Sequence, residues 1–220
     1  MNITAALAWF DEPPEFLARC VRSLEGLVDE VVAVDGGWRW FPGARCASSP
    51  AEVRAIREAA DDAGIKARVI VPSSVFDSQV HKRAFLMEEA GRWSDWVFVI
   101  DADEYIVRHD EAIVRSELAD TDAVVAAVAI ENLHLGDKLP HDYHREGGLR
   151  RRFYRSGTTV VVVHSGYSYQ GRHLLRGEPA VDLGDSVQIV HDICNRGPER
   201  NEKWRQYREA RTRERVEVWV

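Results

Sequence analysis

Three carboxylates, Asp101, Asp103 and Glu104, stand directly after an apolar run of five residues. In an extended chain Asp101 and Asp103 point to the same side, about 7 Å apart at a rise of ~3.3 Å per residue. Two carboxylates beside a hydrophobic strand are costly unless a cation or hydrogen-bond donors compensate their charge. Because carboxylate oxygens suit Mg²⁺ and Mn²⁺, the pattern predicts a divalent-metal site. The alternative interpretation is an acidic strand end that only caps the next helix.

His191 is a second candidate metal ligand, because it also follows an apolar run, at 187–190. If the two strands share a sheet, the side chains of Asp103 and His191 arrive at the same edge of that sheet. One imidazole ligand shifts the preference from Mg²⁺ toward Mn²⁺. Without Asp103, this histidine would be interpreted as a surface or cap residue. His141 and His144, in a polar stretch, form a rival metal site.

Phosphate binding by a glycine cradle is excluded, because the chain has neither G-x-G-x-x-G after a strand nor G-x-x-x-x-G-K-[ST]. A G-x-S-x-G nucleophile motif is also absent. Any phosphate group would therefore be bound by metal and basic side chains. Lys82 and Arg83 could supply positive charge, although a solvated helix face explains them as well. Three consecutive arginines at 150–152 could bind phosphate or an acidic acceptor, or simply form an arginine ladder.

Strands and helices alternate in the first half of the chain. Apolar runs predict strands over 3–10, 30–34, 68–71 and 96–100. Helix-start signals lie between them, at Pro13–Pro14, at Ser49 with Glu52 as a capping box, and at Ser78. This alternation implies parallel β-α-β units, in which ligands bind at the carboxyl ends of the strands. We expect an α/β fold with a mostly parallel central sheet flanked by helices.

The pattern changes after Glu104. We expect a short helix capped by Asp110, a strand over 123–130, a polar segment from 131 to 148 and a final strand over 187–190. Strands over 150–154 and 158–163 are expected to form a small antiparallel hairpin that turns near Ser156–Gly157. A charged helix over 201–220 should pack back through Trp204 and Tyr207.

Composition indicates an ordinary globular protein. With 220 residues, 45% of them hydrophobic and 30% charged, one domain is expected. A net charge of −7 argues against nonspecific binding to nucleic acid or anionic membranes. The sequence shows neither a secretory signal nor an apolar stretch of 18 residues. Three widely spaced cysteines are typical of reduced thiols, and Cys20 fits a core position, so we expect a cytoplasmic protein.

One family resemblance covers most of the chain. Two segments resemble the motif "A-R-N…A…DW-apolar-LDADE" of GT-A fold glycosyltransferases, family 2-like. They are His81-Lys82-Arg83-Ala84 and, after it, Asp95-Trp96-Val97-Phe98-Val99-Ile100-Asp101-Ala102-Asp103-Glu104. The first strand ending near Trp9, the Pro-led helix and the turn at 31–37 also resemble this family. The family's "R-L-F-R…H-E" hairpin is similar to Arg151-Arg152-Phe153-Tyr154-Arg155 followed by Val163-His164. Its C-terminal "H…K" segment is similar to Val190-His191 followed by Lys203 and Tyr207.

The resemblance implies a nucleotide-diphospho-sugar transferase fold, with a nucleotide-binding half over 1–104, an acceptor and metal half over 105–195 and a C-terminal helix over 196–220. It implies a nucleotide-sugar donor and a Mn²⁺ or Mg²⁺ cofactor. The residues that it implies for nucleotide binding are Trp9, Asp35, Lys82, Arg83 and Asp101. For metal binding it implies Asp101, Asp103 and His191. Asp101 could contact the ribose or a metal-bound water.

Two positions depart from the family pattern. Arg83 stands where the family usually has Asn, and Ser165 stands where it often has the Glu of "H-E". An inverting transferase needs a base within hydrogen-bond reach of the acceptor hydroxyl. With Ser165 there, either the base lies elsewhere or the mechanism is retaining. Asp142, His164 and Glu131 are the candidate catalytic residues.

The predicted function is transfer of a sugar from a nucleotide diphosphate, UDP being favoured, to an unknown hydroxyl acceptor. A nucleotidyltransferase of related fold is one alternative. It usually needs a Gly- and Arg-rich N-terminal phosphate loop, whereas residues 3–14 contain no glycine and no basic residue. A non-catalytic protein that binds a nucleotide sugar or a glycan is the other alternative. The intact Asp-Ala-Asp motif argues against it, and the missing "H-E" glutamate argues for it.

Overall fold

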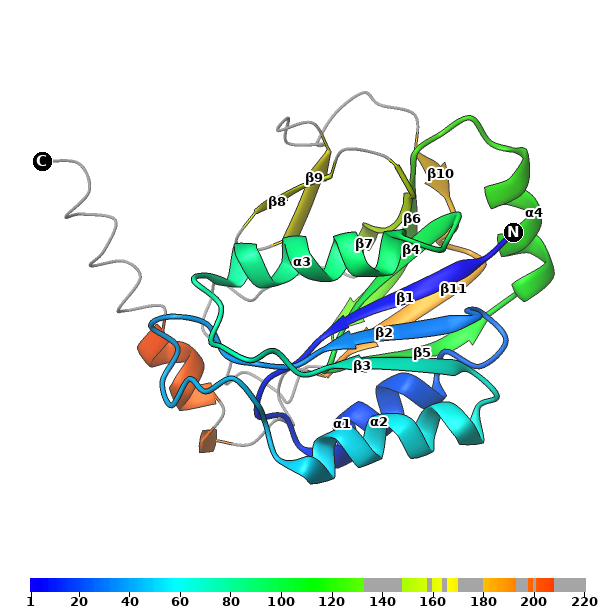
Figure 1. The fold of residues 1–220 in the computed structure, drawn as a ribbon. Coiled ribbons are helices and arrows are strands. Elements are labelled where there is room, and N and C mark those ends of the chain that lie inside the picture. Colours follow the sequence, from blue (N-terminus) through cyan, green and yellow to red (C-terminus); the bar gives the residue numbers. More distant parts are fainter. Residues whose placement is uncertain are drawn as a thin grey trace, which may run out of the picture.

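The central sheet is covered by helices on both faces (Figure 1). The computed structural model describes residues 1–132, 148–157, 160–163, 166–169, 180–192, 198–199 and 201–207. In the first half, strands and helices alternate as the sequence predicts. The elements are β1 (Ile3–Ala8), α1 (Pro14–Arg22), β2 (Glu30–Val34), α2 (Pro50–Asp62), β3 (Lys66–Ile70), α3 (Gln79–Gly91) and β4 (Trp96–Asp101).

Parallel pairing of β3, β2, β1 and β4 forms one half of the sheet. Helices α1 and α2 pack on one face of this half, and α3 packs on the other (Figure 1). Cys20 is fully buried on α1, as expected of a core residue. The predicted capping box is also present, since Ser49 and Glu52 exchange hydrogen bonds at the start of α2. The prediction of an α/β fold with a mostly parallel sheet is therefore confirmed.

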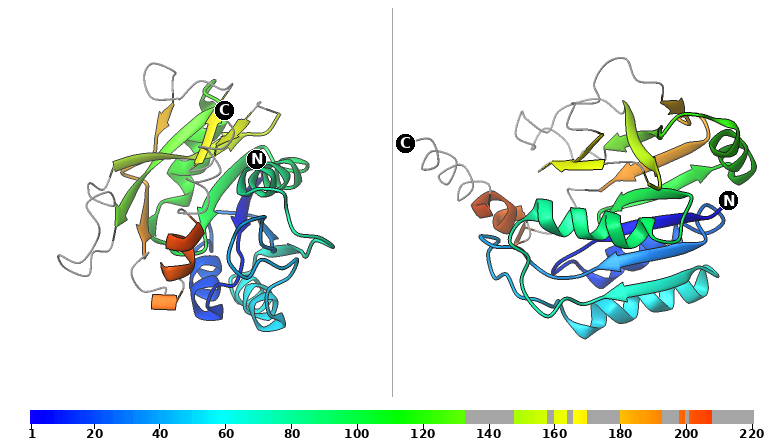
Figure 2. Two further views of the ribbon diagram at one scale, coloured as in Figure 1. Left: turned by 90° about the vertical axis from the view of Figure 1, so that its left-hand side faces the viewer. Right: turned by 45° about the horizontal axis from the view of Figure 1, so that its top comes forward.

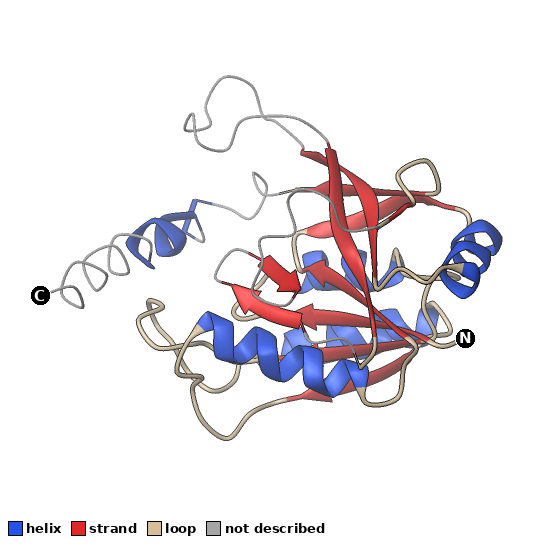
Figure 3. Cartoon of the chain, turned by 90° about the horizontal axis from the view of Figure 1, so that it is seen from above, coloured by secondary structure: helices blue, strands red, loops and turns tan. Residues whose placement is uncertain are grey.

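The second half of the chain extends the sheet with mixed pairing. Its elements are β5 (Glu104–His109), α4 (Glu111–Asp120), β6 (Val125–Asn132), β7 (Gly148–Arg155), β8 (Val160–Val163), β9 (Gly166–Tyr169), β10 (Val181–Asp182) and β11 (Val187–His191). The strand order along the sheet is β3-β2-β1-β4-β7-β6-β11-β5, with β10 paired to β6. Seen from above, the strands of this strongly twisted sheet cross one another (Figure 3).

One prediction about the second half is wrong, and one strand was missed. The strand at 150–154 does not form a hairpin with the strand at 158–163, because β7 lies between β4 and β6 and β8 pairs with β9. Apolar packing explains this choice, since the ring of Phe153 is fully buried and stacks on Phe98 at 4.6 Å. Strand β5 was not predicted at all. It lies at the edge of the sheet and exposes Val107, so its apolar pattern is weak.

A helical segment at 201–207 packs over the ends of β1 and β2 (Figures 1 and 2). Trp204 and Tyr207 contact the rings of Trp38 and Phe41, with centroids 5.4 to 5.8 Å apart, which confirms that they pack back. The remainder of the predicted helix, 208–220, lies outside the described residues. In the part that the structure describes, no helix is long and apolar enough to cross a membrane.

Asp11 anchors this segment electrostatically. Its carboxylate accepts hydrogen bonds from Lys203 of the segment and from Arg45, each at 2.7 Å. Burial raises the pKa of Asp11, but the two cations outweigh this effect and hold the pKa below its ordinary value. Asp11 also adopts a left-handed backbone conformation with φ of 57°, which asparagine and aspartate tolerate better than most residues.

Replacing Asp11 by Asn should remove the charge while keeping the backbone geometry. Because the pKa is lowered on folding, the ion pairs stabilise the protein fully above the ordinary aspartate pKa and lose this effect as the pH falls through the lowered pKa of the folded state. We expect D11N to be less stable than wild type by about 0.5–1 kcal/mol at pH 7, and the difference to vanish near pH 2. Chemical denaturation at both pH values measures this, with D62N, in the exposed Arg22–Asp62 pair, as the control. An equal difference at both pH values would contradict the assignment.

Candidate functional site

The acidic turn lies where the curled sheet closes on itself. Asp101 is the last residue of β4 and Glu104 is the first residue of β5, so only Ala102 and Asp103 connect the two strands. In the sheet, however, β4 and β5 are separated by β7, β6 and β11. A two-residue connection is therefore possible only because the sheet curls and brings β5 back toward β4. This places the carboxylates beside the carboxyl end of β11.

Asp103 and His191 are in direct contact. Asp103 Oδ2 lies 2.9 Å from His191 Nε2, across 88 residues of sequence. Pairing of β11 with β5 sets His191 opposite Glu104, and the backbone N–H of Asp192 donates to the Asp103 carbonyl at 2.7 Å. The Asp192 carboxylate in turn accepts a hydrogen bond from Arg19 at 2.7 Å. Burial lowers the pKa of His191, but the hydrogen bond with Asp103 and the nearby carboxylates raise it above its ordinary value.

Two arginines neutralise Asp101. Arg83 Nη2 on α3 donates to Asp101 Oδ1 at 3.0 Å, and Arg152 Nη1 on β7 lies 3.8 Å from Asp101 Oδ2. Burial raises the pKa of Asp101, but the charges of Arg83 and Arg152 lower the pKa by more than burial raises it. The pKa of Asp101 therefore lies below its ordinary value. Asp101 is therefore held as a carboxylate. In this structure the carboxylate of the first aspartate pairs with arginines, whereas the carboxylate of the second contacts His191.

Glu104 fixes the shape of the acidic turn. Its Oε2 accepts the backbone N–H of Asp101 at 2.9 Å, and its Oε1 is bound by Arg152 Nη2. Burial raises the pKa of Glu104 to about 7, against the lowering effect of Arg152. Neither Glu104 nor Arg152 was predicted as part of this network. The sequence marked Arg152 only as one of three consecutive arginines, which does not show which of them points into the site.

The donor atoms of Asp103 and His191 fit a divalent cation. The distance of 2.9 Å between Oδ2 and Nε2 is that of a hydrogen bond, and a cation bound by both atoms would take the place of this bond. Within the described ranges, no group of three or more His, Cys, Asp or Glu side chains is arranged to hold a metal ion. Two protein ligands leave positions for water and phosphate oxygens, as Mg²⁺ sites beside phosphates usually do. The donor set is thus suited to Mn²⁺ or Mg²⁺ bound together with a phosphorylated ligand.

Asp35 follows β2 directly and is fully buried. One carboxylate oxygen accepts the backbone N–H of Ser48 at 2.7 Å, and the other accepts the Ser48 hydroxyl and the Gly36 N–H, each at 2.6 Å. These bonds tie the segment before α2 to the end of β2. The predicted contact of Asp35 with a nucleotide would have to replace some of them.

Trp9 and Lys82 connect the ends of β1 and β2. The Trp9 ring is buried in the core, and its backbone N–H donates to the Val34 carbonyl at 3.1 Å. The Lys82 ammonium is buried as well, and it donates to the Trp9 carbonyl and, at 2.6 Å, to the Gly36 carbonyl. Its charge is thus placed on backbone oxygens beneath the predicted nucleotide site. The nucleotide-binding roles of Trp9 and Lys82 remain predictions.

The three candidate bases differ in their placement. Asp142 and His164 lie outside the described residues, as do His141, His144 and Ser165. Glu131 lies on β6 beside Val190, so its side chain leaves the sheet on the face opposite to His191. There it accepts a hydrogen bond from Gln188 at 3.2 Å.

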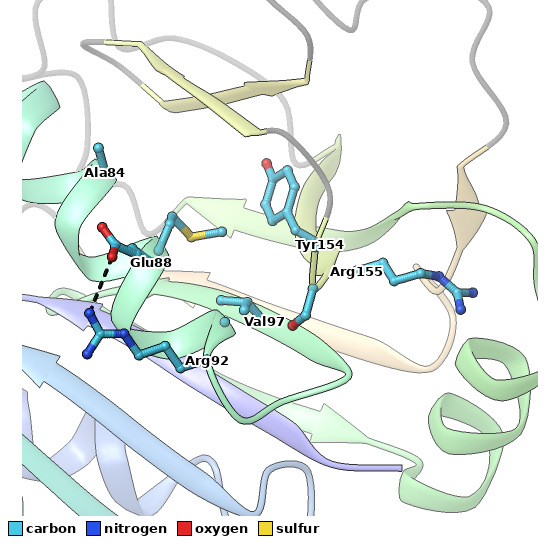
Figure 4. Close-up of a pocket in the computed structure, with 10 residues that line it drawn as sticks. Ala84, Glu88, Arg92, Val97, Tyr154 and Arg155 are labelled. Carbon is cyan, nitrogen blue, oxygen red and sulfur yellow. Dashed lines mark hydrogen bonds and ion pairs between the residues drawn. The ribbon is translucent and has the colours of Figure 1, made fainter.

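A separate cavity of about 360 Å³ lies at the far end of β4 (Figure 4). It lies between α3, with Ala84 and Met87, and the strand residues Val97 and Tyr154. Val97 is the second residue of β4, whereas Asp101 is its last. This cavity therefore does not belong to the acidic turn.

Replacing Lys82 by Met should destabilise the fold. The apolar side chain keeps the length but leaves the Trp9 and Gly36 carbonyls without their ammonium donor, which costs about 2–4 kcal/mol for two buried acceptors. Urea denaturation measures the difference, with K66M at an exposed lysine as the control. A loss below ~0.5 kcal/mol would contradict the bridging role of the ammonium.

Comparison with known proteins identifies structural neighbours only. No protein-family model and no curated protein matches the chain. Among solved structures, S. aureus TarS is 14% identical over 71% of this chain and 28% of its own, with a TM-score of 0.49. TarS 1–349 in complex with UDP is 15% identical over 71% and 47% of the two chains, with a TM-score of 0.48. GalNAc-T7 with UDP, GalNAc and Mn²⁺ is 14% identical over 60% and 24%, with a TM-score of 0.43.

This chain spans less than half the length of each of these neighbours. A shared fold does not by itself define an activity, so the function is argued below from the side chains of the site. In the path of its chain, the protein is similar to parts of TarS and of GalNAc-T7.

Proposed function

We propose that this protein is a metal-dependent glycosyltransferase that moves a sugar from a nucleotide-diphosphate sugar to a hydroxyl acceptor. The observation that carries the proposal is the contact between Asp103 and His191 at the acidic turn. A carboxylate and an imidazole at the carboxyl edge of an α/β sheet form a minimal cation site in the region where such sheets bind ligands. The surrounding arginines add positive charge suited to phosphate.

The chemistry of sugar transfer matches this charge distribution. Breaking the glycosidic bond leaves negative charge on the departing nucleoside diphosphate. Asp103 and His191 would hold the Mn²⁺ or Mg²⁺ ion, which stabilises this charge as a Lewis acid when it is bound. Asp101 would join them as a ligand of the ion, directly or through a bound water, or would contact the ribose. Arg83, one residue beyond the buried Lys82 on α3, would approach the diphosphate.

The donor is proposed to be UDP-linked. Its base and ribose would lie over the ends of β1 and β2, near Trp9 and Asp35. The acceptor is a hydroxyl compound, and its proton would be taken by Asp142 or His164, because Glu131 leaves the sheet on the face opposite to His191. Transfer to a glycan, a protein or a small molecule is compatible with this arrangement.

Replacing Asp103 by Asn should abolish metal-dependent nucleotide binding without unfolding the protein. The amide keeps the shape of the side chain and its contact with His191 but removes the charge that a divalent cation needs. We expect the affinity for UDP in the presence of Mn²⁺ to fall by about 100-fold, which corresponds to ~2.8 kcal/mol. Calorimetry with Mn²⁺ and with EDTA measures this change, and thermal melting reports the integrity of the fold.

D77N serves as the matched control, because Asp77 is an exposed carboxylate paired with Arg39 at the surface. It should bind UDP and Mn²⁺ like the wild type. Unchanged Mn²⁺-dependent affinity in D103N would contradict the metal assignment. Failure of the wild type to bind UDP, GDP or dTDP with Mn²⁺ would contradict the proposed function itself.

A further inference from the structure

Asp101 is paired with cations of the protein itself. Arg83 reaches one carboxylate oxygen from α3, and Arg152 approaches the other from β7. A divalent cation that bound Asp101 would therefore compete with two guanidinium groups for the same oxygens.

Arg152 owes its position to a β-bulge. Ala126 on β6 pairs with Phe153 and Ala127 pairs with Arg151, so the pairing skips Arg152. The pairing of β7 with β4 extends only from Arg155 to Phe153, so it does not include Arg152 either. Bulges of this kind reorient a side chain and occur frequently beside active sites. Here the bulge interrupts the regular pairing of the backbone, and the guanidinium of Arg152 points toward Glu104 and Asp101.

Arg155, on the same strand, shows the contrasting arrangement. Its guanidinium donates to the carbonyls of Ala123 and Thr121 and lies 4.8 Å from the centroid of the Trp96 ring. In Figure 4 it points away from the cavity at this end of β7. Arg155 therefore stabilises the sheet, whereas Arg152 compensates the acidic turn.

We propose that Arg83 and Arg152 exchange partners, pairing with Asp101 in the absence of a cation and binding the diphosphate of the nucleotide when a divalent cation is bound. The inference rests on the proposed function and deepens it. Three carboxylates, Asp101, Asp103 and Glu104, face two guanidinium groups and the imidazole of His191. A divalent cation adds two positive charges, and a diphosphate supplies the negative charge that restores the balance.

Guanidinium groups are suited to both partners, because their planar N–H donors match carboxylate and phosphate oxygens equally well. Since the cation displaces the arginines from Asp101 and the diphosphate rebinds them, cation and nucleotide should bind more tightly together than either does alone. An arginine with only a structural role would not produce this coupling.

The test compares two affinities in the same variants. In R83M, Asp101 loses a competing cation, so Mn²⁺ alone should bind about fivefold more tightly than in the wild type. UDP in the presence of Mn²⁺ should bind about 10-fold more weakly, because the diphosphate loses a charged partner. Calorimetry measures both affinities. The opposite signs distinguish the exchange from a general loss of structure, which would weaken both.

R152M leaves the buried Glu104 without its cation, so the double variant R152M/E104Q is used to keep the turn neutral. It should show the same opposite changes as R83M. R155M is the matched control on β7, and it should lower the melting temperature while leaving both affinities unchanged.

Parallel weakening of both affinities, or no change in either, would overturn the exchange. If the wild type fails to bind UDP with Mn²⁺, the proposed function fails, and the measurement with Mn²⁺ alone still decides whether the arginines compete for Asp101.

Discussion

The need to compensate three carboxylates on one short turn determines the architecture of this site. Asp101, Asp103 and Glu104 lie within four residues, and Asp103 and Glu104 are almost completely buried. Buried charges of one sign are unfavourable unless partners of opposite charge reach them. The partners come from three different elements, with Arg83 on α3, Arg152 on β7 and His191 on β11. The turn is thus the point at which distant parts of the chain must meet.

The curl of the sheet follows from the same constraint. β4 and β5 are consecutive in the chain, but three other strands lie between them in the sheet. Because β5 is the neighbour of β11, the short connection brings His191 to Asp103. Hydrogen bonds of Glu104 and Asp192 with the backbone of the turn then hold it in place. Two local features, a tight connection and a bulge at Arg152, therefore convert a twisted sheet into a charged site.

Sequence reasoning predicted the elements better than their partners. Strands with continuous apolar runs, such as β2 and β4, were located closely, because burial on both faces leaves a clear pattern. Proximity of Asp103 and His191 could be predicted because both follow such runs. By contrast, the turn signal at Ser156–Gly157 marks where a strand ends but does not say which strand lies beside it.

The role of Arg152 could not be predicted for a related reason. A β-bulge shifts the alternation of side chains, so the face on which Arg152 lies cannot be counted from its neighbours. Edge strand β5 escaped prediction because its exposed residues interrupt the apolar pattern. The family resemblance implied roles for Asp35 and Lys82, but their bonds to Ser48, Trp9 and Gly36 depend on the folded loops.

The long sequence separations within the site have a consequence for biosynthesis. Glu104 meets Arg152 across 48 residues, and Asp103 meets His191 across 88. Contacts between residues so distant in sequence are slow to form in folding, and two partners of the acidic turn, Arg152 and His191, leave the ribosome after the turn itself. A nascent chain that ends before β7 already contains the three carboxylates and Arg83, but it still lacks Arg152 and His191. The site is therefore completed only when β11 has been synthesised, and truncated chains of this protein are expected to be inert.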